Sequence, residues 1–232
     1  MGSFDTNVIM EWAPLLLQGL LVTILFTVGS LAAGLVIGLL VAVLGLSRYS
    51  LLRAASRIYV DAIRGTPLLL QLFILYYGLP GAGLKLSAPV AGILGLAINA
   101  GAYLAEIFRA GIEAVPRQHV QAARSLGMSS RQTLLRIELP QAVGLVLPPM
   151  ANEVISLVKS TSLISTISIG ELLRSGQIAV SITFAPLEIY LVVAVLYLAL
   201  NVLLSSLVRY LEARAGSGMR SEARRSLQDV GV

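Results

Sequence analysis

An acidic and a basic residue interrupt an otherwise apolar stretch of the chain. Between residues 139 and 170 the ionisable side chains are those of Glu153 and Lys159, and Asn152 precedes the acid. Charged groups inside a membrane are costly and therefore mark functional positions. We expect Glu153 to face a path through the membrane and to pair with a cationic group of a solute, with Asn152, Lys159 and Arg64 beside the same path. The alternative is that Glu153 forms an internal ion pair with Lys159 or Arg64.

Polar side chains in two other apolar stretches could line the same path. Asn99 and Tyr103 are four residues apart, so they share one face of a helix. They could hydrogen-bond a solute, or equally bond another helix. Gln71 lies in a third apolar stretch and is a further candidate for the path.

Two pairs of opposite charges are better explained as structural. Glu106 and Arg109 are three residues apart, and so are Asp61 and Arg64. Side chains at this spacing meet on a helix surface, so we expect an ion pair within the chain at each place. Thr66-Pro67 is expected to shape its helix rather than to contact a solute.

Several kinds of chemistry are excluded by the composition. The chain has no cysteine and a single histidine, His119, which excludes disulfides, thiolate sites and a histidine metal cluster. It has no Gly-Lys dipeptide and therefore no phosphate-binding loop of the Walker type. We expect no catalytic activity, and any ATP that drives the protein must be bound by another chain.

The composition is that of a membrane protein. Of 232 residues, 56% are hydrophobic and 12% charged, and the mean hydropathy is +0.85, whereas soluble domains carry roughly 25% charged residues. About 20 apolar residues cross a bilayer as a helix. Stretches without Asp, Glu, Lys, Arg or His cover residues 12–47, 65–84, 86–105 and 189–208. The first stretch is too long for a cleavable signal peptide and no basic residue precedes it, so we expect a retained helix.

We predict an all-α integral membrane protein with about five transmembrane helices in a single domain. The expected spans lie within residues 12–46 and at about 58–79, 88–107, 141–163 and 187–210. Proline interrupts the fourth span, where we expect a break or bend. A turn is expected at residues 78–83, a partly buried outer segment at 164–185, and a flexible tail at 211–232.

The positions of the arginines predict the orientation. Cytoplasmic segments of membrane proteins collect Lys and Arg. With five spans, the first loop, the segment 116–142 and the tail share one side, and they hold nearly all of the positive charge. The N-terminus is therefore expected outside and the C-terminus in the cytoplasm. This topology explains the net charge of +5 without a nucleic-acid partner.

The first span carries a stripe of small residues. Ser30, Gly34, Gly38 and Ala42 recur at every fourth position, a spacing that lets membrane helices approach closely. The stripe could pack within the subunit or against a second one. Because no internal repeat is visible, a single copy is not expected to enclose a path, and a second copy or a paralogue would be needed.

The segment 116–142 is polar and rich in arginine, and it resembles the "EAA" coupling loop of permease subunits of ABC importers. The family pattern is Glu-Ala-Ala, three residues, Gly, and nine residues before Ile-x-Leu-Pro. Here it reads Gln121-Ala122-Ala123, Gly127 and Ile137-Glu138-Leu139-Pro140.

Other segments resemble the importers of polar amino acids in particular. Residues 64–73, RGTPLLLQLF, are similar to that group's RGTPLLVQLF, and residues 102–112, AYLAEIFRAGI, to its AYxAEIFRGGI. Asn152-Glu153 and Lys159-Ser160-Thr161-Ser162-Leu163 are similar to its NExI and KDTSL motifs. The blocks follow one another between residues 58 and 170.

The resemblance implies the type I ABC importer permease fold and a multi-pass location in the bacterial cytoplasmic (inner) membrane. It also implies two permease subunits, identical or paralogous, two cytoplasmic ATPases that bind ATP and Mg, and an external solute-binding protein that delivers the amino acid. No cofactor is expected in this chain. The coupling segment would form a short helix in a groove of the ATPase. Its expected coupling residues are Gln121, Ala122, Ala123, Arg124, Gly127, Met128 and Pro140.

The chain departs from the family pattern at three places. Gln121 stands where the family has glutamate, Gln118-His119 where it usually has Gly-Gln, and Ser160 where KDTSL has aspartate. An amide keeps a hydrogen-bond acceptor but loses the strength that charge adds. We hypothesise that the partner permease is a paralogue with an intact glutamate; a fully active homodimeric permease would contradict this.

The sequence thus predicts the membrane-spanning subunit of an ATP-driven importer of a polar amino acid. The ammonium of such a substrate could pair with Glu153, which would favour arginine, lysine or histidine. An ion-coupled or passive transporter without an ATPase is the alternative, and it leaves the coupling segment unexplained. A membrane enzyme is a third hypothesis, for which we find no set of catalytic residues.

Overall fold

The computed structural model describes residues 6–229, with side chains for residues 6–208 and for Tyr210. These residues are almost entirely helical. The α-helices are α1 (Thr6–Gly45), α2 (Ser50–Arg64), α3 (Leu68–Phe73), α4 (Ala88–Glu113), α5 (Arg117–Ser125), α6 (Ser130–Thr133), α7 (Leu139–Ser160), α8 (Leu172–Thr183) and α9 (Pro186–Asp229). Short π-helical segments at Ile74–Gly78 and Leu134–Glu138 and 3-10 segments at Leu79–Ala82 and Thr161–Ile167 join them.

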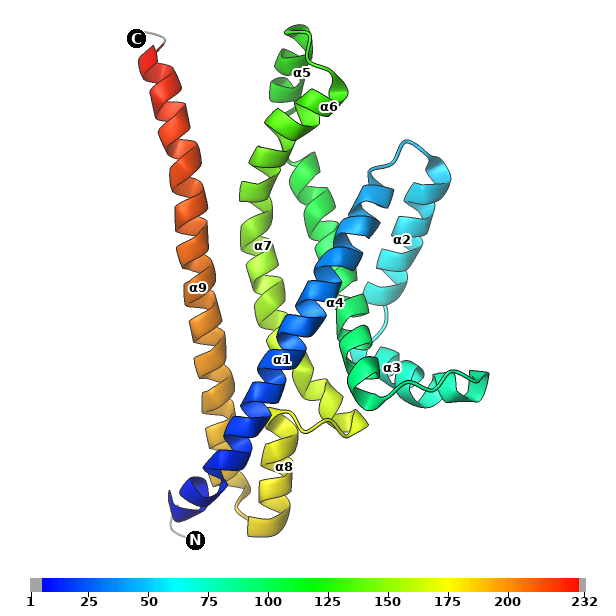
Figure 1. Ribbon diagram of the computed structural model, residues 1–232, viewed down its shortest axis with the longest axis vertical. Coiled ribbons are helices and arrows are strands. Elements are labelled where there is room, and N and C mark those ends of the chain that lie inside the picture. The colour runs from blue at the N-terminus through cyan, green and yellow to red at the C-terminus, as the bar shows by residue number, and fades with distance from the viewer. Residues whose placement is uncertain (1–5, 230–232) are drawn as a thin grey trace.

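Four long helices form the body of the molecule. Helices α1, α4, α7 and α9 run along its long axis (Figure 1). Each contains a segment long and apolar enough to cross a membrane, and the bent pair α2 and α3 supplies a fifth if it is counted as one span. Leucine and valine side chains of α1 and α9 stay exposed on the subunit, as expected where lipid or a partner covers them. The prediction of about five transmembrane helices is confirmed.

The small residues of α1 pack within the subunit, against α4. A Cβ atom at Gly38 would lie 2.7 Å from Cβ of Leu104, and one at Gly34 would lie 3.3 Å from Cβ of Ala100. Ser30 is fully buried on the same stripe. The stripe therefore serves the contact between α1 and α4, which is the first of the two possibilities that its spacing allowed.

The predicted second span is not one helix. The chain bends by 100° between α2 and α3, so the expectation of a continuous helix over residues 58–79 is wrong. Pro67 explains the break, since proline lacks the N–H that the next helical turn would use and also disfavours helix at Thr66. Tyr59 of α2 holds the pair against α4 by donating its hydroxyl to the carbonyl oxygen of Ile98 at 2.7 Å.

The predicted break in the fourth span is absent. Helix α7 continues from Leu139 to Ser160 with Pro148 and Pro149 inside it. Membrane helices tolerate proline where neighbouring elements satisfy the freed backbone groups. As a consequence, one continuous helix joins the end of the coupling segment to Glu153.

A buried acid at the start of α8 holds the outer segment, residues 164–185, against the rest of the subunit. Glu171 is fully buried, and its carboxylate accepts hydrogen bonds from the backbone N–H of Leu173 at 2.9 Å and of Arg174 at 2.7 Å. The hydroxyl of Tyr197 in α9 donates to the same carboxylate at 2.7 Å. Glu171 therefore caps α8, as acceptors at helix starts do, and ties it to α9.

Replacing Glu171 by alanine should destabilise the folded subunit by about 2–4 kcal/mol, because two cap donors and the Tyr197 hydroxyl lose a buried partner. Thermal unfolding of the purified protein measures this. Tyr197→Phe is the matched control, since it removes one of the three bonds and should cost less. Equal melting temperatures for Glu171→Ala and the unmodified protein would contradict the capping role.

The basic segments gather at one end of the molecule. Figure 1 shows the end of α1, helices α5 and α6, and the end of α9 at one end, with the start of α1 and helix α8 at the other. This arrangement agrees with the predicted grouping of the basic segments on one membrane face, while the orientation itself stays a prediction. Helix α9 continues to Asp229. The flexibility predicted for residues 211–232 also stays a prediction, because the side chains of 211–232 lie outside the described ones.

Candidate functional site

The break between α2 and α3 opens a cavity against α4 and α7. Its volume is about 510 Å³, within the roughly 300–1,000 Å³ typical of small-molecule sites. The break, α4 and α7 each contribute polar side chains to its lining. The lining consists of Arg64, Gly65, Thr66, Pro67, Leu68, Asn99, Tyr103, Glu153, Ser156, Leu157, Ser160 and Leu163.

Glu153 contributes a carboxylate to this cavity. Within the described residues it makes no hydrogen bond and no ion pair, and the ion pairs that are formed belong to Arg109. The internal ion pair with Lys159 or Arg64, which the sequence left open, is therefore not formed. Glu153 and Arg64 line the same cavity, so this space offers one charge of each sign.

Arg64 stacks on an aromatic ring instead of pairing with Asp61. The centre of its guanidinium lies 5.1 Å from the ring centroid of Tyr103, a geometry in which the ring face attracts the cation. The predicted ion pair between Asp61 and Arg64 is absent among the described residues. Arg64 is the last residue of α2, directly before the bend.

Two predicted path residues do not line the cavity. Lys159 faces a separate and largely apolar cavity of about 420 Å³ with Tyr190 and Tyr197, and Asn152 is exposed outside both. The reason is the helical period: residues six apart, such as Glu153 and Lys159, point about 120° apart around a helix. The placement of Lys159 and Asn152 beside the path is not tested by this cavity and stays a prediction.

Asn99 lines the cavity and also bonds a residue of another helix, so neither of the two roles that the sequence left open excludes the other. It lines the cavity together with Tyr103, and its Nδ2 donates to Oε1 of Gln71 at 3.2 Å. Gln71 itself lies behind the lining, 9% exposed, and bonds the residues of the break. Thr66 and Pro67, which were expected only to shape the helix, also line the cavity.

Two serines of the lining were missed in the sequence. Ser156 and Ser160 follow Glu153 by three and seven residues, which places all three on one face of α7. Applying this spacing to Glu153 would have found them. With Glu153 they form a polar stripe along the cavity wall.

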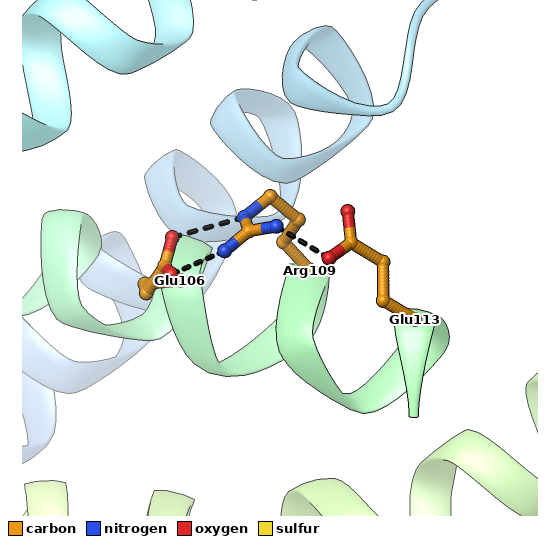
Figure 2. Close-up of polar contacts among 3 residues, drawn as sticks. All are labelled: Glu106, Arg109 and Glu113. Atoms are coloured by element: carbon orange, nitrogen blue, oxygen red, sulfur yellow. Dashed lines mark hydrogen bonds and ion pairs between the residues drawn. The ribbon is translucent and has the colours of Figure 1, made fainter. Parts of the chain in front are cut away.

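The predicted pair of Glu106 and Arg109 is confirmed and is larger than expected (Figure 2). Nε of Arg109 donates to Glu106 at 3.0 Å, a second guanidinium nitrogen contacts the same carboxylate, and Nη1 reaches Glu113 at 2.5 Å. All three residues belong to α4. A cation that is shared between two acids has little attraction left for a solute, so this cluster is structural.

The coupling segment does form the predicted short helix, α5. Gln121, Ala122 and Arg124 are exposed on it, whereas Ala123 is buried in the subunit. Ala123 therefore packs inside the subunit, and its expected part in coupling stays a prediction. Leu126, which the motif did not single out, is 84% exposed at the end of α5 and is an apolar side chain that a partner could cover.

Gly127 ends α5 rather than providing close approach. Its φ is +80°, a conformation that favours glycine. The N–H of Gly127 donates to Arg124 at 2.9 Å and the N–H of Met128 to Ala123 at 3.1 Å, the pair of bonds known as the Schellman motif. Met128 is half-buried and Pro140 is exposed in the first turn of α7.

A side-chain bond ties α5 to the start of α7. Nδ1 of His119 and Oε1 of Gln141 are 2.7 Å apart, and Nε2 of Gln141 donates to the carbonyl oxygen of Ile137. Because that nitrogen is the donor of the amide, the oxygen that faces His119 is an acceptor. His119, one of the departures from the family pattern, therefore donates from Nδ1 and joins the two helices.

Comparison with known families decides what kind of protein carries this arrangement. Residues 34–217 match the model of the family described as "Binding-protein-dependent transport system inner membrane component". The match includes the cavity, the α2–α3 break and the coupling segment. The chain belongs to this family. It is thus an inner membrane component of a transport system, a permease, and the sequence resemblance to permeases is confirmed.

Individual permeases are similar along most of their length. A probable amino-acid ABC transporter permease, YckA of Bacillus subtilis (strain 168), is 38% identical over 197 residues, which cover 85% of this chain and 87% of that protein. The glutamine transport system permease GlnP of Escherichia coli (strain K12) is 36% identical and covers 91% and 97%. A solved structure titled "Crystal structure of an amino acid ABC transporter with histidines" has a TM-score of 0.88 at 35% identity, covering 92% of this permease and 100% of that chain.

Proposed function

We propose that this permease forms the path of an ATP-driven importer of polar amino acids, with basic amino acids favoured. The observation that carries the proposal is the cavity that Glu153 and Arg64 share. Every amino acid has an ammonium and a carboxylate, so a cavity with one charge of each sign is complementary to it. Since Glu153 makes no hydrogen bond or ion pair within the described residues, it can take either the ammonium or a cationic side chain. The names of the relatives, which include a glutamine permease, support an amino acid as the substrate.

The partners follow from the family's description and the exposed surfaces of the chain. Two cytoplasmic ATPases bind ATP and Mg and receive α5, where Leu126 is the exposed apolar contact. A solute-binding protein delivers the amino acid at the opposite end, near the start of α1 and α8. A second permease, identical or paralogous, completes the enclosure of the path. In this arrangement the N-terminus lies outside and the C-terminus in the cytoplasm.

We propose that α5 and α7 form a mechanical link from the ATPase to the cavity. Helix α5 is bonded to α7 through His119 and Gln141, and α7 continues without interruption to Glu153. Movement of α5 by the ATPases would therefore shift Glu153, Ser156 and Ser160 as one face. Rigid elements with bonded ends are the physical means by which such coupling is carried.

Reconstitution tests the proposed function. The chain is inserted into proteoliposomes with its ATPase, its partner permease and the solute-binding protein, and uptake of radiolabelled arginine, lysine, histidine and glutamine is measured with ATP inside or outside. We expect uptake that requires ATP and substrate-stimulated ATP hydrolysis that requires this chain. Uptake that proceeds without the ATPase would favour an ion-coupled or passive transporter and overturn the proposal.

A further inference from the structure

Gln71 satisfies the backbone where the second span breaks. The bend leaves carbonyl groups at the end of α2 without helical partners. Nε2 of Gln71 lies 2.8 Å from the carbonyl oxygen of Ile63 and 3.2 Å from that of Thr66, and it is 3.0 Å from Oγ1 of Thr66. At 9% exposure, Gln71 reaches these acceptors from inside the protein.

These contacts determine the orientation of the Gln71 amide, that is, which neighbours its NH₂ group and its oxygen face. Backbone carbonyl groups can only accept hydrogen bonds, so the side of Gln71 that faces Ile63 and Thr66 must be its NH₂ group. The carbonyl oxygen of the amide then faces α4. That assignment follows from the chemistry of the backbone partners, which can only accept hydrogen bonds.

The orientation of Asn99 follows from that of Gln71. Oε1 of Gln71 can only accept, so Asn99 must present its own NH₂ group, and Nδ2 lies 3.2 Å away. One hydrogen of Nδ2 is used in this bond, and Oδ1 of Asn99 forms no hydrogen bond within the described residues. Asn99 lines the cavity together with Glu153, so its acceptor Oδ1 is available to a solute.

We propose that Gln71 is a positioning residue that sets the hydrogen-bonding polarity of the cavity: it holds Asn99 so that Oδ1 is offered to the solute. This inference rests on the proposed function. Beside the donors of Arg64, the cavity then presents two acceptors, Asn99 and Glu153, and these favour a substrate side chain that carries N–H donors. Without Gln71, Asn99 could rotate and offer either its oxygen or its NH₂ group, and the preference would be lost.

The test uses the complete complex of permeases and ATPases in lipid nanodiscs, and equilibrium binding of proteinogenic amino acids and of citrulline. In two pairs of ligands the second member has an oxygen in place of one side-chain nitrogen of the first: arginine with citrulline, and glutamine with glutamate. The wild-type complex should prefer the first member of each pair. Gln71→Met, which keeps the length of the side chain but removes the amide, should reduce that preference roughly tenfold, the value of one good hydrogen bond.

Tyr59→Phe is the matched control. It removes the hydrogen bond from Tyr59 to Ile98, which also joins the α2–α3 pair to α4 next to Asn99 but does not reach the cavity lining. A general loosening of this contact would weaken all ligands alike in both variants. We expect the preference to stay within about twofold of wild type in Tyr59→Phe, since no polar atom of the lining changes.

Each outcome decides between the two proposals. A wild-type complex that binds no amino acid overturns the proposed function and this inference with it. A wild-type complex that binds amino acids but prefers neither member of a pair, or prefers citrulline or glutamate, overturns the inference alone. The same holds if Gln71→Met shows the wild-type preference, or if it weakens all ligands equally as a structural defect would.

Discussion

A transporter that carries Glu153→Gln should lose about 100-fold of its uptake of basic amino acids, because truncating one partner of a desolvated charge pair costs several kcal/mol. The substitution keeps the size of the side chain and removes its charge. Glu153 makes no hydrogen bond or ion pair within the described residues, so folding and assembly should be unaffected. Uptake by reconstituted proteoliposomes at several substrate concentrations measures the effect, which should fall more on arginine and lysine than on glutamine.

The matched control for this change is Glu188→Gln. Glu188 lies in the first turn of α9, is half-buried like Glu153, and lines neither of the two cavities described above. Its replacement should leave uptake within about twofold, as is usual for substitutions away from a site. If Glu153→Gln retained both the rate and the selectivity of the unmodified transporter, the role of Glu153 in binding substrate would be refuted.

Local spacing predicted part of the cavity correctly. Asn99 and Tyr103 share a face of α4 because they are four residues apart, and both line the cavity. The same rule predicted the ion pair of Glu106 and Arg109. In each case the decisive geometry lies within one helix, where the sequence determines which side chains are neighbours.

Contacts between helices could not be predicted in this way. Arg64 lies against Tyr103 because the chain bends by 100° after α2, and hydropathy treats both sides of that bend as one apolar run. The inward position of Ala123 and the outward position of Ala122 depend on how α5 packs on its neighbours. A pattern of small residues predicts that another element packs closely against a helix, but it does not identify that element.

The role of Gly127 also could not be predicted from the sequence alone. In the sequence it was interpreted as a place for close approach by a partner, since glycine has no side chain. The structure gives it a φ of +80° at the end of α5, which explains the glycine without any partner. Gly127 ends α5 at a point where Leu126 is left exposed.

Leu126→Asp should abolish stable binding of the ATPase to this permease, because an 84% exposed leucine at the end of α5 is the apolar anchor that the proposed interface would bury. Burying a charge there without a partner costs far more than leaving leucine in place, and anchors of this kind dominate interface energies. We expect at least a tenfold loss of ATPase in complexes purified through the permease, and ATP-driven uptake should fall with it.

Leu84→Asp separates this effect from a general one of placing an acid on an exposed leucine. Leu84 is 62% exposed in the turn after α3, away from α5, so the ATPase should still copurify. The folded permease should tolerate Leu126→Asp equally well, since an exposed side chain contributes little packing to its own subunit. If the ATPase were retained by Leu126→Asp at the wild-type ratio, α5 could not be engaged through Leu126, and the proposed coupling from α5 to α7 would need another point of contact.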